Sequence, residues 1–239
     1  MLKPIASALI ASSVLMASSG VMADDWFVGG TVGKAKIKSD TKMTAVEKDG
    51  TSESLKTPGV SSSDNYFGLR AGKFVNDNIR VYINAARNSA GGEKTLFTDE
   101  DKKTTDTLKG GKIKNTELSL SMDYVDNLFS MKNTKYFAGG TLGLNKMEVK
   151  STFTHIDHGN PDESGSMSKS KKDTGYIYGV QFGVIQEFTD NFSAELGYRY
   201  ARTNNKASIS FPGDDGDSIK STFKQKSQKM PYMTVSYHF

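Results

Sequence analysis

The chain of 239 residues contains no cysteine. It can therefore form no disulfide, no thiolate metal site and no thiol nucleophile. Beyond residue 23 it also has no long apolar run, which excludes a membrane-spanning helix in that part of the sequence. If the chain crosses a membrane, it must do so as a closed barrel, because every backbone polar group has to be paired within hydrocarbon.

Proline is scarce, with 5 residues, whereas glycine is abundant, with 23. This composition is expected of closely packed β-strands, because proline lacks the backbone N–H that donates a hydrogen bond to the neighbouring strand. The mean hydropathy is negative, at −0.49. This value is compatible with a barrel, because lipid-facing and lumen-facing residues alternate along each strand and their average is mixed.

The formal charge is +4, and loss of Lys3 with an N-terminal signal would lower it by one, to +3. The excess is spread over polar stretches of the chain instead of forming one basic block. It predicts weak attraction to anionic lipopolysaccharide or polysaccharide and no binding of nucleic acid.

The N-terminus has the three parts of a secretory signal peptide. Lys3 is followed by an apolar run from Ile5 to Met16 and by the small residues that lead to Ala23. We therefore expect residues 1–23 to be a signal peptide, cleaved after Ala23, and residues 24–239 to be one barrel domain. A transmembrane anchor is the alternative, but the apolar run is shorter than the roughly 18 residues that a spanning helix needs.

The C-terminus alternates with a period of two residues. The first set of alternating residues is Pro231, Met233, Val235, Tyr237 and Phe239, and the second is Tyr232, Thr234, Ser236 and His238. This period predicts a strand with an apolar face that continues to the last residue.

Three Asp-Asn pairs between apolar residues, in segments 75–79, 125–128 and 188–192, predict reversals between strands. Four long polar stretches lie between them. They span about 38–64, 89–112, 151–174 and 203–228, and we interpret them as mobile, charged loops. Short turns on one side and long loops on the other are typical of bacterial outer-membrane barrels, and three turns with four loops join eight strands.

The segments between turns and loops alternate apolar and polar residues. The expected lipid-facing residues are Trp26, Val28 and Val32; Phe67, Leu69 and Ala71; Val81, Ile83 and Ala85; Leu118, Leu120, Met122 and Tyr124; Tyr136, Ala138, Leu142 and Leu144; Tyr176, Tyr178, Val180, Phe182 and Val184; and Phe192, Ala194, Leu196, Tyr198 and Tyr200. A soluble lipocalin-like barrel is the rival fold, but its interior is apolar. Here the opposite face carries charges and amides, which favours a membrane barrel.

Charged residues on the lumen-facing side form the candidate functional site. They are Arg70, Arg80, Glu117, Asp123, Glu187, Glu195 and Arg199. Buried charges are costly unless they are paired, so we expect Glu117 to pair with Arg70, Arg199 or both. Such a network closes the bore and stabilises the barrel, whereas a narrow or gated pore is the alternative.

Other candidate sites are weaker. His155 and His158 lie in a polar stretch without a helix to align their rings, which favours a solvated loop over a metal site. His238 has no evident nucleophile beside it, so the sequence predicts no catalytic residue, no metal and no cofactor. The charge clusters at 100–103 and 171–172 have two interpretations. They either keep the loops solvated or form a surface that adheres to host glycans or receptors.

The whole mature chain resembles the opacity-type and OmpA-type, porin-like family of outer-membrane barrels. The segment Trp26–Gly33 is similar to the aromatic, glycine-rich first strand of that family, and Tyr237 and Phe239 resemble its assembly signal. No peptidoglycan-binding domain is expected after Phe239. The resemblance implies an eight-stranded, monomeric, non-enzymatic barrel in the outer membrane, in contact with lipid, lipopolysaccharide and the assembly machinery. Its implied role is structural or one of surface interaction, and a narrow porin or a host-directed adhesin is the alternative.

Overall fold

The computed structural model describes most of the chain beyond the N-terminal segment. The described residues are 26–46, 48–49, 51–57, 61–90, 94–100, 104–160, 164–212 and 218–239. The expected signal peptide, its cleavage after Ala23 and part of the charge cluster at 100–103 lie outside them. Within the described residues, no helix is long and apolar enough to span a membrane.

Every regular element of the described chain is a β-strand. The strands are β1 (Trp26–Val46), β2 (Ser52–Thr57), β3 (Ser61–Asn76), β4 (Ile79–Ala90), β5 (Lys94–Glu100), β6 (Thr104–Asn127), β7 (Thr134–Asp157), β8 (Gly165–Glu187), β9 (Phe192–Thr203), β10 (Lys206–Pro212) and β11 (Ser218–His238).

Eight of these strands form a closed antiparallel ring. Its order is β1-β3-β4-β6-β7-β8-β9-β11, and β11 pairs with β1 to complete the circle. In the closing pair, Gly30 lies opposite Val235 and Thr31 opposite Thr234. The predicted eight-stranded barrel is thus confirmed, and its closure leaves no free edge.

The two faces of the wall follow the predicted alternation. None of the expected lipid-facing residues is buried, and Leu69, Leu142 and Tyr176 are 60%, 63% and 63% exposed. Together they form an apolar belt around the barrel, defined here as the outward residues of 26–32, 67–71, 79–85, 118–124, 136–144, 176–184, 192–200 and 231–237. Such a belt is suited to the hydrocarbon of a bilayer, because contact between this apolar surface and water would be unfavourable.

Short turns close one end of the barrel. Asn76 Oδ1 accepts hydrogen bonds from the backbone N–H groups of Asn78 and Ile79, at 3.0 and 2.8 Å. At the third turn, Thr189 Oγ1 accepts from the backbone N–H of Phe192 at 3.0 Å. The middle turn is longer, as predicted, and contains Phe129 at φ 55°.

The interpretation of the four polar stretches as irregular loops was wrong. Strands β6 and β7 have 24 residues each, and β8 has 23. About 9–11 residues suffice to cross a bilayer, so the surplus continues beyond the belt as paired β-structure. Apolar residues such as Met147 and Val149 alternate with charged residues there, and the abundance of polar residues hides this period in the sequence.

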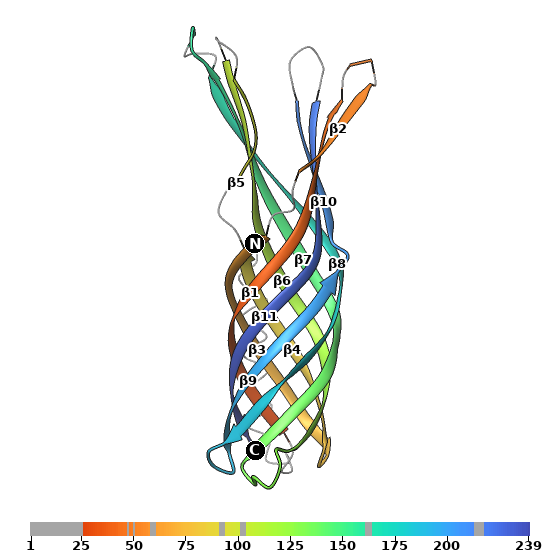
Figure 1. Ribbon diagram of the computed structural model, residues 1–239, viewed down its shortest axis with the longest axis vertical. Helices are drawn as coiled ribbons and strands as arrows, with labels where there is room; N and C mark the ends of the chain where they lie inside the picture. Colours follow the sequence, from red (N-terminus) through yellow and green to blue (C-terminus); the bar gives the residue numbers. More distant parts are fainter. Residues whose placement is uncertain are drawn as a thin grey trace.

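Figure 1 shows these extensions as two diverging arms above the barrel. Strands β10, β11, β1 and β2 pair in one arm, and β5, β6, β7 and β8 pair in the other. We call the described residues of 38–57, 94–113, 146–172 and 205–226 the crown. A core of buried apolar side chains lies inside it, formed by Met43, Leu108, Ile113, Met147, Val149, Ala207, Ile209, Phe211 and Phe223.

Candidate functional site

The barrel lumen contains six buried charged side chains, the only ones in the described part of the chain. They are Arg70, Arg80, Arg199, Glu117, Asp123 and Glu195, each at most 5% exposed. Three are cations and three are anions, so their formal charges cancel.

Four of the six form one cluster toward the end with the short turns. Arg70 makes a two-pronged contact with Glu195, at 3.1 Å from Nη1 and 2.6 Å from Nη2. Arg80 Nη2 lies 2.8 Å from Asp123 Oδ2 and 2.9 Å from Glu195 Oε2. Glu195 therefore holds both arginines, and removal of this one carboxylate would leave Arg70 without an ion-pair partner in the described residues.

Neutral polar groups satisfy the remaining acceptors of this cluster. Tyr232 donates to Glu195 at 2.9 Å, and Tyr82 donates to Asp123 at 3.1 Å. Gln181 donates from Nε2 to Asp123 Oδ1 at 2.7 Å and also contacts the Tyr82 hydroxyl. The carboxylates thus keep several hydrogen bonds in the absence of bulk water, as buried charges require.

Aromatic rings line the same cluster. The Arg80 guanidinium lies 4.9 Å from the centre of the Phe137 ring and 5.9 Å from that of Phe27. Phe27 also packs against Phe74, with ring centroids 6.0 Å apart. Cation–π contacts and aromatic packing therefore surround the ion pairs in this part of the lumen.

A second charge layer lies between this cluster and the crown. Arg199 Nη2 is 2.7 Å from Glu117 Oε1, which also accepts a hydrogen bond from Ser119 at 2.6 Å. Beyond it, four asparagines bridge β4, β6, β7 and the segment after β9. Asn115 donates to Asn88 at 3.0 Å, and Asn145 donates to Asn115 at 3.0 Å and to Asn205 at 2.8 Å.

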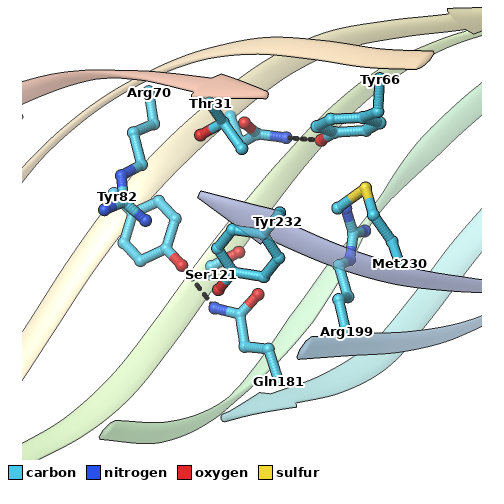
Figure 2. A pocket seen from close by; sticks show the side chains of 10 residues that line it. Thr31, Tyr66, Arg70, Tyr82, Ser121, Gln181, Arg199, Met230 and Tyr232 are labelled. Atoms are coloured by element: carbon cyan, nitrogen blue, oxygen red, sulfur yellow. Dashed lines mark hydrogen bonds between the residues drawn. The ribbon is translucent and has the colours of Figure 1, made fainter. Parts of the chain in front are cut away.

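A small cavity separates the two charge layers. Figure 2 shows Arg70, Tyr82, Gln181, Arg199 and Tyr232 pointing toward it from five different strands. Its volume is about 20 Å³, which is space for about one water molecule.

The comparisons with known proteins agree with this architecture. A family profile described as the outer membrane protein beta-barrel domain matches residues 5–239. The chain belongs to that family. It is therefore a protein of the Gram-negative outer membrane, and the predicted family and location are confirmed.

A solved neisserial structure shares this fold, and solved structures from two other bacteria match the chain with lower TM-scores. Neisserial surface protein A is 18% identical, with a TM-score of 0.52, and the match covers 90% of this chain and 97% of that one. OprG of Pseudomonas aeruginosa is 16% identical over 91% and 97% of the two chains, with a TM-score of 0.48. Ail of Yersinia pestis is 16% identical over 91% and 100%, with a TM-score of 0.39. No curated protein matches the sequence.

The barrel brings six of the seven proposed lumen residues together and separates the seventh. Glu187 lies at the rim, where it pairs with Lys135 at 2.6 Å, and both side chains are about one-third exposed, at 33% and 29%. Glu117 contacts Arg199, whereas Arg70 reaches Glu195 instead. Which of these residues become partners depends on how far neighbouring strands are shifted relative to one another around the ring. The alternation of residues along a single strand gives no information about this shift.

His238 has a neighbour, Ser193, that the sequence did not predict. The Ser193 hydroxyl lies 2.8 Å from His238 Nε2, although the two residues are 45 positions apart. In the described residues, no carboxylate hydrogen-bonds to this ring, and Phe27 and Phe74 pack against it. The pair therefore lacks the third group that orients the base in a catalytic triad.

The two histidines of the third polar stretch also lie in β-structure or at its end. His158 Nε2 is 2.9 Å from the Thr105 hydroxyl. No group of three or more candidate ligands gathers into a metal site among the residues that the structure describes.

Proposed function

We propose that this outer-membrane barrel is a non-enzymatic, monomeric anchor whose lumen is closed and whose crown interacts with molecules outside the cell. The observation that carries the proposal is the mutual pairing of all six buried lumen charges. A conducting pore needs a continuous path of water, and unpaired charges on its wall would attract ions of one sign. Here the charges cancel and the space between the layers is about one water molecule in volume.

The crown supports the second half of the proposal. It has its own apolar core and paired strands, so it presents a folded surface instead of a set of flexible loops. A preformed surface loses less conformational entropy when it binds a partner. Host glycans and receptors are the proposed class of partner for this surface, whereas Tyr237 and Phe239 are the proposed contact for the assembly machinery during biogenesis.

Planar-bilayer recordings test the closed lumen. We expect no steady current from the wild-type barrel. The double variant Glu117→Ala/Arg199→Ala removes one cation and one anion together, so it leaves no unpaired charge from that layer and widens the bore. We expect brief openings from it. The control is Lys135→Ala/Glu187→Ala, which removes an equivalent pair at the exposed rim and should stay silent.

A steady wild-type current that the lumen variant leaves unchanged would exclude the closed lumen. That result would favour the alternative function, a narrow porin for small solutes. Folding of each variant is checked by its shift in electrophoretic mobility before and after heating.

A further inference from the structure

The small cavity between the two charge layers has a wall of uneven charge. Both Arg70 and Arg199 line it, whereas no aspartate or glutamate is among the described residues of its wall. The carboxylates contact the terminal nitrogens of these arginines instead. Glu195 accepts from Nη1 and Nη2 of Arg70, and Glu117 accepts from Nη2 of Arg199. The wall of the cavity is therefore positive, although the six buried charges of the lumen cancel.

Each of these two guanidinium groups also has an unused donor. Arg70 Nε and Arg199 Nε are buried and have no hydrogen-bond partner in the part of the chain that the structure describes. Arginine only donates hydrogen bonds, and a buried donor without an acceptor is destabilising. Two such donors beside one cavity indicate that its occupant supplies an acceptor.

Tyr66 provides a third donor. Its hydroxyl oxygen accepts a hydrogen bond from Asn84 at 2.9 Å, which leaves the phenolic proton to donate elsewhere. The other two tyrosines of the wall, Tyr82 and Tyr232, already donate to carboxylates. Figure 2 shows the ring of Tyr66 beside the cavity.

We propose that this cavity holds a single halide ion, which is chloride under ordinary conditions. The ion accepts hydrogen bonds from Arg70 Nε, Arg199 Nε and the Tyr66 hydroxyl. A volume of about 20 Å³ admits one small species and is too small for sulfate or phosphate. The oxygen of a water molecule accepts two hydrogen bonds, so water leaves one of the three donors unsatisfied. Charge-assisted hydrogen bonds from two guanidinium groups offset the cost of burying the ion.

The bound ion would connect the two charge layers. Arg70 belongs to the cluster near the short turns, and Arg199 belongs to the layer below the crown. A halide between them joins both layers in one network and stabilises the folded barrel. The inference goes beyond the closed lumen, because a closed barrel that held water in this cavity would also be silent in bilayer recordings.

Urea unfolding of the full-length barrel in phosphatidylcholine vesicles tests the proposal. Chloride is exchanged for gluconate at constant ionic strength, so that screening of surface charges stays the same. For one site in the folded state, each tenfold increase in chloride above its dissociation constant should raise the ratio of folded to unfolded protein about tenfold. Bromide should act in the same way and sulfate should not. A ratio that does not depend on halide would overturn the proposal.

Three variants locate the effect. Glu117→Gln/Arg199→Met removes one donor of the cavity and leaves no unpaired charge, and it should abolish the dependence on chloride. Lys135→Met/Glu187→Gln removes an ion pair at the rim and should keep the wild-type dependence. Tyr66→Phe removes one hydroxyl with little change in volume and should raise the half-saturating chloride concentration about tenfold. Tyr66→Phe also decides the matter if the first variant does not fold. Wild-type chloride dependence in Tyr66→Phe or in the first variant would overturn the proposal.

Anomalous X-ray scattering identifies the occupant directly. The wild-type barrel is refolded and crystallised in bromide, so that the ion enters while the lumen is still open. We expect an anomalous bromine peak in contact with the Nε atoms of Arg70 and Arg199. Density at this position without an anomalous signal would identify water and overturn the proposal, while the closed lumen would still stand.

Discussion

The lumen and the crown lie on the same strands yet have opposite interiors. In the lumen, the inward side chains include all six buried charges and many neutral polar groups, with aromatic rings such as Phe27 and Phe137 between them, and the outward side chains are apolar. In the crown, inward side chains such as Met147 and Val149 are apolar, while outward ones such as Lys146 and Lys150 are charged. Strand β7 passes from one arrangement to the other between Leu144 and Lys146 without a break in its period of two.

This inversion shows which feature of the residue alternation depends on the medium around the barrel wall. The period of two fixes only that alternate residues share a face. Which face is apolar depends on the medium outside the wall, because hydrocarbon favours an apolar outer surface and water favours a polar one. The position of the inversion therefore marks where the wall leaves the membrane.

The largest expected effect is in the lumen, at Glu195. Replacement by alanine leaves the buried Arg70 and Arg80 without a shared carboxylate, and loss of one partner of a buried ion pair costs about 3–5 kcal/mol of unfolding free energy. Urea unfolding in lipid vesicles measures the loss. Glu187→Ala, at the exposed rim, should cost less than about 1 kcal/mol. Equal stabilities of the two variants would show that the lumen charges are not buried.

The crown should respond to loss of apolar volume. Phe223 is 0% exposed within the crown core, and Phe223→Ala should cost about 3 kcal/mol of local stability. Amide hydrogen exchange should accelerate in β10 and the start of β11, whereas the barrel amides keep their protection. Lys224→Ala, on the adjacent outward position, serves as the control. Unchanged exchange in the Phe223 variant would mean that the crown is not held by a core.

The lipid-facing wall should reject charge. Leu142 is 63% exposed in the middle of the belt, and Leu142→Arg should destabilise the barrel by about 2–4 kcal/mol in vesicles. Val46→Arg, at a half-buried outward position of the crown, should cost far less. Comparable losses of stability in the two variants would contradict the conclusion that Leu142 faces hydrocarbon and Val46 faces water.

Two neighbouring glycines give the smallest and most local contrast. A Cβ on Gly139 would lie 2.1 Å from Asp123 Oδ1 and 2.2 Å from the Met122 carbonyl oxygen, whereas the nearest atom to a Cβ on Gly140 is 3.8 Å away. Gly139→Ala should therefore cost about 1–3 kcal/mol through displacement of Asp123, and Gly140→Ala almost nothing. Denaturant midpoints compare them, and a neutral Gly139→Ala would mean that the lumen packs loosely.

Much of the barrel could be predicted because it depends on local order. Alternation places residues such as Leu69 and Arg70 on opposite faces, and Asp-Asn pairs mark reversals. The partner of Arg70 could not be predicted, since Glu195 reaches it from a strand 125 residues away. The crown was missed for a different reason. Its inward residues are separated by Lys, Ser and Thr, and so polar a composition indicates loops as readily as strands.

The most direct test of the inversion is a scan of spin labels along β7, one residue at a time from 138 to 150, in vesicles. Accessibility to lipid-soluble oxygen and to a water-soluble nickel complex is measured at each position. Outward labels at 138–144 should meet oxygen, those at 146–150 should meet nickel, and inward labels at 141 and 147 should meet neither. Nickel access at 140 and 142, or exclusive oxygen access at 148 and 150, would contradict the account.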